Sequence, residues 1–148
     1  MRATLGLLSL VLLVGTGTAS GADAPLLTKT YQSGYTPAEW ARPARCDVYT
    51  DKVVIERRYG DVSDKGFVAR EEKAIQIMGG IDKVIQAAQS EKLTETENSM
   101  CDGPEWQASA GNFVLYGSGG CGTPRKDRKG PNSRMLIDLV NIYCPIGN

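Results

Sequence analysis

The chain has four cysteines, Cys46, Cys101, Cys121 and Cys144, and no histidine among its 148 residues. An even number of cysteines favours two disulfide bonds if the protein is exported to an oxidising compartment. A zinc site is the alternative, but zinc-binding cysteines usually come in Cys-x-x-Cys pairs, and that spacing does not occur here. We therefore expect two disulfides and no metal.

The missing histidine also limits catalysis. Ser-His-Asp and Cys-His machinery cannot be assembled without it, and the GxxxxGK[ST] phosphate loop is absent. Paired carboxylates of the glycosidase type remain open at Glu71 with Glu72 and at Asp102 with Glu105. Adjacent residues of a strand point to opposite faces, however, and Asp102 begins an Asp-Gly-Pro turn. We expect no enzyme activity and no cofactor, with a small envelope hydrolase of cell-wall glycan as the alternative.

A basic cluster is the sharpest local feature of the sequence. Its members are Arg125, Lys126, Arg128 and Lys129, interrupted only by Asp127. They follow several glycines, so we expect them in a loop running from Gly117 to Gly130. Such a loop would suit an acidic protein partner, and a solvated charged loop without a partner is the alternative. No aromatic residues interleave with the charges, which argues against nucleic-acid binding.

The spacing of apolar residues predicts two strand pairs, each followed by a helix. Alternation predicts strands at 53–59, 67–77, 106–110 and 113–116, although a helix would also suit the second segment. Helical spacing predicts helices that begin near residues 81 and 131. We therefore expect a small α+β domain of the form ββα–ββα, in which two helices cover an antiparallel sheet.

The second predicted hairpin suggests how the cysteines pair. With its turn at Gly111-Asn112, opposed residues have numbers that sum to about 223, and those of Cys101 and Cys121 sum to 222. These two cysteines should therefore lie side by side and form one bridge. Cys46 and Cys144 then remain for the other.

Residues 1–22 have the pattern of a secretory signal peptide. Arg2 precedes an apolar stretch of about 10 residues, which is too short to span a bilayer, and small residues follow it. An uncleaved anchor is the alternative. We expect a periplasmic or secreted protein with no stable membrane anchor after cleavage. Residues 23–45 should form an extended N-terminal segment, and residues 46–148 the disulfide-stabilised α+β domain.

Removal of the signal peptide leaves 16 basic and 17 acidic side chains. This balance gives no general attraction to nucleic acid or to an anionic membrane. We therefore expect a small exported binding module, an inhibitor or immunity-type factor, that contacts a protein partner through the basic cluster. A purely structural envelope accessory protein is the remaining alternative.

Overall fold

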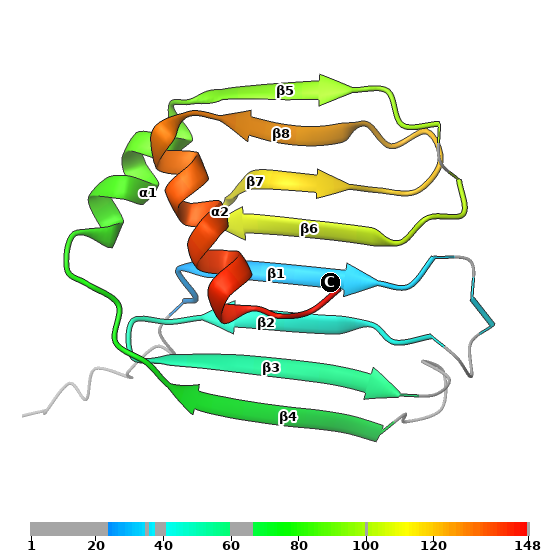
Figure 1. Ribbon diagram of the computed structural model, residues 1–148, viewed down its shortest axis with the longest axis horizontal. Helices are drawn as coiled ribbons and strands as arrows, with labels where there is room; N and C mark the ends of the chain where they lie inside the picture. The colour runs from blue at the N-terminus through cyan, green and yellow to red at the C-terminus, as the bar shows by residue number, and fades with distance from the viewer. Residues whose placement is uncertain (1–23, 35, 38–40, 60–66, 100, 148) are drawn as a thin grey trace, which may run out of the picture.

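The computed structural model describes residues 24–34, 36–37, 41–59, 67–99 and 101–147, and the expected signal peptide lies outside them. The described residues form an eight-stranded antiparallel sheet and two helices (Figure 1). The strands are β1 (Leu27–Gln32), β2 (Ala44–Val48), β3 (Lys52–Tyr59), β4 (Phe67–Ala74), β5 (Lys92–Thr96), β6 (Glu105–Ala110), β7 (Phe113–Ser118) and β8 (Arg125–Lys129). The helices are α1 (Ile81–Gln89) and α2 (Pro131–Tyr143).

The α+β architecture agrees with the sequence prediction, but the ββα–ββα layout does not match the structure. Each helix follows four strands, and the spatial order of the strands is β4-β3-β2-β1-β6-β7-β8-β5. The predicted strands correspond to β3, β4, β6 and β7, and the predicted hairpin pairs Ala110 with Phe113. Four strands are absent from the prediction. β1, β5 and β8 contain few apolar residues, and β2 was missed although Ala44, Cys46 and Val48 alternate with charged residues.

The N-terminal segment contributes the centre of the sheet. β1 is extended, as expected for residues 23–45, but it lies between β2 and β6 and is part of the domain. Leu27 is fully buried and Lys29 is nearly so. The domain therefore begins before Cys46, because β1 joins the two halves of the sheet and contributes buried residues to the core.

α2 lies on one face of the sheet, and α1 lies beside α2 at one end of the strands (Figure 1). α2 crosses β8, β7, β6 and β1 diagonally, and α1 packs against α2. The core between α2 and the sheet contains the fully buried Leu27, Leu115, Leu136 and Val140. Burying a leucine completely contributes about 1.5–3 kcal/mol, so these contacts hold α2 on the sheet. Among the described residues, neither helix is long and apolar enough to cross a bilayer.

The opposite face of the sheet is polar and carries ion pairs. Arg45 pairs with Asp47 at 2.7 Å, and Arg70 with Glu56 at 3.5 Å. An antiparallel sheet can leave one face to water while the other carries the core. The uncovered face therefore explains why so many strand residues of this chain are charged.

Glu91 caps the N-terminus of α2 from outside the helix. The capping position, Gly130, has no side chain, and Pro131 follows it. The Glu91 carboxylate accepts hydrogen bonds from the backbone N–H groups of Asn132 and Ser133, at 3.0 and 2.7 Å, and from both of their side chains. A Cβ on Gly130 would overlap this carboxylate, so glycine leaves it room. A negative charge at this end of a helix is favourable.

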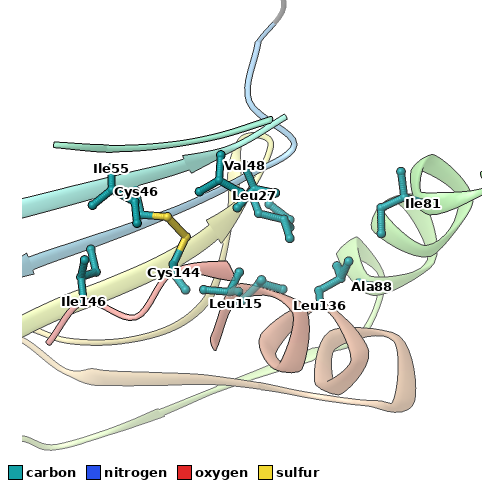
Figure 2. Close-up of a cluster of buried hydrophobic side chains, with 14 residues drawn as sticks. Leu27, Cys46, Val48, Ile55, Ile81, Ala88, Leu115, Leu136, Cys144 and Ile146 are labelled. Atoms are coloured by element: carbon teal, nitrogen blue, oxygen red, sulfur yellow. A yellow bond between two sulfur atoms is a disulfide. The ribbon is translucent and has the colours of Figure 1, made fainter. Parts of the chain in front are cut away.

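The two disulfides join the same cysteines that the sequence predicts. Cys46 of β2 is bonded to Cys144, just after α2, with Cα atoms 5.7 Å apart. Figure 2 shows this bond inside the buried cluster, near Ile55 and Ile146. It ties the end of α2 to the sheet.

The second disulfide holds a crossover connection. The chain leaves β5 at one edge of the sheet and passes the ends of β8 and β7 before it enters β6 (Figure 1). Cys101 of this crossover is bonded to Cys121 of the β7–β8 connection. The Asn98 side chain also donates a hydrogen bond to the Gly119 carbonyl, at 2.7 Å. The crossover is therefore fastened to the strands that it passes.

Candidate functional site

The basic cluster lies in a strand, β8. The prediction of a loop from Gly117 to Gly130 is therefore wrong for residues 125–129. β8 pairs with β7 on one side and β5 on the other, and these backbone bonds hold it without any apolar side chain. Its charged residues are therefore placed by strand geometry. Arg125 and Lys129 lie on the α2 side, whereas Lys126 lies on the uncovered face and pairs with Glu95 at 3.6 Å.

Arg128 is engaged in structural contacts. Its Nε donates to the carbonyl of Val114 at 2.9 Å. Its Nη1 donates to the carbonyls of Gln89 and Glu91, at 3.0 and 2.7 Å. The guanidinium carbon lies 4.9 Å from the centroid of the Phe113 ring. Arg128 therefore joins β7, β8 and the end of α1, and its guanidinium is occupied by these contacts.

A groove of about 730 Å³ lies between α2 and β8, with its floor on β1, β6 and β7. Its two walls meet at Gly130, where β8 leads directly into α2. The floor carries Lys29, Trp106 and Tyr116. This size falls within the range of about 300–1,000 Å³ that is usual for ligand sites. The groove brings together residues from both halves of the chain.

Lys29 lies in the floor of the groove and is only 4% exposed. It occupies the covered face of β1, opposite Cys46 of β2 and Ala108 of β6. Its ammonium donates to the Cys144 carbonyl at 3.3 Å and to Asn141 Oδ1 at 3.5 Å. Burial lowers the pKa of Lys29, because the charged form loses hydration. Lys29 therefore brings a basic side chain to the floor of the groove, where its ammonium is held by two oxygen acceptors.

Sequence reasoning missed Lys29 because β1 was not recognised as a strand. The alternating residues Leu27, Lys29 and Tyr31 share the covered face once β1 is known. The lysine then stands out as a charged residue at a core position. That pattern is the signal in the sequence from which this site could have been found.

The wide end of the groove is aromatic and polar. The Trp106 and Tyr116 rings have centroids 5.0 Å apart and planes at 57°. The Arg125 guanidinium carbon lies 5.9 Å from the Trp106 centroid. The Tyr116 hydroxyl donates to Asn141 Oδ1 at 3.0 Å, and burial raises the pKa of Tyr116. The hydroxyl thus keeps its proton at neutral pH and orients the amide beside Lys29.

Charges of both signs line the walls. The residues of β8 from Arg125 to Lys129 all border the groove, and Arg134 and Asp138 come from α2. The Lys129 ammonium lies 3.6 Å from an oxygen of Asp127. With Lys29 in the floor, the groove has more cationic than anionic side chains. It is therefore suited to a ligand with net negative charge.

The paired carboxylates do not converge in this groove. Glu71 and Glu72 lie on β4, at the far edge of the sheet. Glu71 pairs with Arg57 at 3.4 Å, and Glu72 pairs with Lys52 at 3.4 Å, on the other face. In the part of the chain that the structure describes, no three His, Cys, Asp or Glu residues cluster as metal ligands would.

The second carboxylate pair lies near the crossover. Asp102 is exposed within the crossover itself, and Glu105 is exposed at the first position of β6. Neither residue lines the groove between α2 and β8. The two pairs considered from the sequence are thus separated from the candidate site.

A second groove, of about 640 Å³, lies on the uncovered face. It runs across the sheet along residues that are paired on adjacent strands. These include Arg45, Thr30, Gln107 and Lys126. Several of its charges are engaged in ion pairs, including Arg45 with Asp47. The groove between α2 and β8 is therefore the stronger candidate.

No protein-family model matches this chain, and no curated protein or solved structure matches it either.

Proposed function

We propose that the protein is an exported binding protein that holds an acidic protein partner in the groove between α2 and β8. The observation that carries the proposal is the nearly buried ammonium of Lys29 in the groove floor, with Arg125 and Arg134 on the walls. Cationic grooves attract acidic partners and guide their approach. All four members of the basic cluster line this groove, and Arg125 and Lys129 do so from the α2 side of β8.

The covalent framework supports an exported compartment. Two disulfides are consistent with an oxidising, exported compartment. We propose that residues 1–22 direct export, and that the protein acts in the periplasm or after secretion as an inhibitor or immunity-type factor. The placement of the carboxylate pairs supports binding over hydrolysis, because Glu71 and Glu72 are engaged in ion pairs on opposite faces of an edge strand.

The proposal is tested by affinity capture from the compartment in which the protein acts. Immobilised wild type is compared with the double variant Arg125→Glu/Arg134→Glu. A matched control, Lys73→Glu/Lys83→Glu, changes the charge equally at exposed lysines on β4 and α1, away from the groove. We expect a partner that the control retains, the groove variant loses, and added salt releases.

Two outcomes would contradict the proposal. A partner retained equally by the groove variant and the control would place the contact elsewhere on the molecule. Absence of any specific partner, together with an envelope defect in a deletion strain that the groove variant fully repairs, would favour a structural role.

A further inference from the structure

Charges of alternating sign run along the β8 wall of the groove. Arg125, Asp127 and Lys129 are separated by two residues each, so their side chains share a face and repeat about every 7 Å. From the wide end of the groove to the narrow end at Gly130, the order on this face is positive, negative, positive. Lys126 and Arg128 also border the groove, but they occupy the alternate positions of β8, where Lys126 pairs with Glu95 and Arg128 donates to backbone carbonyls. A charge pattern with this period matches an extended polypeptide, whose alternate side chains have the same spacing.

Near the narrow end of the groove, the α2 wall carries charges in the same order as the β8 wall. Arg134 lies about 6 Å along the helix axis from Gly130, and Asp138 lies about 12 Å along it. From Gly130 outward, this wall is therefore positive and then negative, as β8 is from Lys129 to Asp127. Lys29 and Asn141 lie further out, where β8 carries Arg125. The strand β8 and the helix α2 thus carry charges of the same sign at similar distances from Gly130.

Resting on the function proposed above, we propose that the groove recognises an extended terminal segment of its partner with acidic, basic and acidic residues at alternate positions. The two acidic residues lie against the cations at the ends of the groove, and the basic residue lies against Asp127 and Asp138. Five extended residues span about 16 Å, the length of β8 itself.

A terminal segment fits because one end of the groove is closed. β8 and α2 are joined through Gly130 alone, so a chain cannot run through that end. The segment must finish there, and Lys129 and Arg134 then face its last acidic group. At the wide end, Trp106 and Tyr116 offer the entering chain an apolar floor.

The two aspartates supply the selectivity. A uniformly acidic chain would place a carboxylate against Asp127 and Asp138, and like charges held together lower affinity. This repulsion separates the correct partner from polyanions, including nucleic acid. Order of charges, and not net charge alone, then decides which segments bind.

The test uses two peptides of identical composition and the full-length protein. The matched peptide has the sequence Glu-Ser-Lys-Ser-Glu, and the permuted peptide has Glu-Ser-Glu-Ser-Lys; both carry the same N-terminal fluorophore. We expect fluorescence anisotropy at low ionic strength to show the matched peptide binding about tenfold more tightly, because two positions change from attraction to repulsion. Equal affinity of the two peptides would overturn the proposal.

A reciprocal exchange of charge gives a second readout. The variant Arg125→Glu/Asp127→Lys/Lys129→Glu sets the β8 wall against the unchanged α2 wall, so it should abolish the preference between the matched and permuted peptides. If that variant does not fold, Asp127→Asn replaces it and should reduce the preference between matched and permuted peptides. An unchanged preference in the folded variant would overturn the proposal.

The two proposals fail in different ways. If capture of the partner depends on the groove but peptide order has no effect, the charge order is wrong and the binding function stands. If capture does not depend on the groove, the binding function is wrong, whatever the peptides do.

Discussion

Glu91 makes the stability of the fold depend on pH. Partial desolvation would raise the pKa of its carboxyl, but the hydrogen bonds from Ser133 and Asn132 outweigh it and lower the pKa from 4.5 to about 2. Between these values the unfolded chain binds a proton that the folded chain does not. The stabilisation by Glu91 is therefore complete above about pH 4.5 and is lost as the pH falls towards 2.

We expect Glu91→Gln to lower the free energy of unfolding at pH 7 and to flatten its decline between pH 4.5 and pH 2. Urea denaturation at a series of pH values measures both effects. Glu97→Gln is the control, since Glu97 is exposed and lies just after β5. Parallel pH profiles for wild type and Glu91→Gln would show that the carboxylate is not the cap.

Arg128 and Lys126 should differ in their effect on stability although they are close in sequence. Arg128→Ala removes charge-assisted hydrogen bonds to three backbone carbonyls, and we expect a loss of about 2 kcal/mol. Lys126→Ala removes one partly exposed ion pair, for which we expect less than about 1 kcal/mol. Thermal or urea unfolding of the two variants tests this order. A larger loss for Lys126→Ala would contradict the structural role of Arg128.

At the scale of elements, β3, β6, β7 and the two helices were predicted from the regular spacing of their apolar residues, whereas β2 was missed although Cys46 and Val48 are buried at alternate positions. β3 alternates Val53 and Ile55 with residues of the other face, and α2 spaces Leu136 and Val140 by one helical turn. The hairpin of β6 and β7 was also predicted, because Gly-Asn lies between two alternating segments. These signals are local, so they need no knowledge of the fold.

β8 could not be predicted in the same way. The segment Arg125–Lys129 has no apolar residue. One of its faces is exposed to solvent and the other lines the groove, so neither face packs against the core. Only its neighbours, β7 and β5, make it a strand. The candidate site was thus half predicted: its cations at Arg125 and Lys129 were singled out, but Lys29 and Arg134 become neighbours only through the tertiary fold.

The two disulfides should differ in their access to reductant. Cys101 and Cys121 are exposed, whereas Cys46 and Cys144 are fully buried. We expect a mild thiol reductant to open only Cys101–Cys121 in the folded protein, because exchange requires access to a sulfur atom. Alkylation followed by peptide mass analysis measures which cysteines react.

Opening that bridge should also loosen the crossover locally. Hydrogen exchange would then rise in residues 97–104 and 119–124, while β2 and β3 keep their protection. Equal reduction of both bridges under native conditions would contradict the buried position of Cys46–Cys144.

For the molecule as a whole, the Cys46–Cys144 bond is the main covalent constraint. It joins residues 98 apart, whereas Cys101 and Cys121 are 20 apart. Closing a loop of about 100 residues stabilises by about 4–5 kcal/mol in the chain-entropy model, compared with about 3 kcal/mol for a short loop. We expect Cys46→Ala/Cys144→Ala to lower the free energy of unfolding more than Cys101→Ala/Cys121→Ala does. Urea denaturation compares the pairs, and the reverse order would contradict this expectation.

The strand order also has a consequence for the time course of folding. Among the strands that the structure describes, β5 is an edge strand whose only neighbour is β8, and the chain reaches β8 only after β6 and β7. During synthesis, β5 therefore has no partner, while β1 to β4 can already pair as a meander with β1 as an open edge. We expect pulse-labelled hydrogen exchange to protect β2 and β3 before β5. The sheet would then grow outward from its first half, and β5, although made midway along the chain, would be the last strand to join.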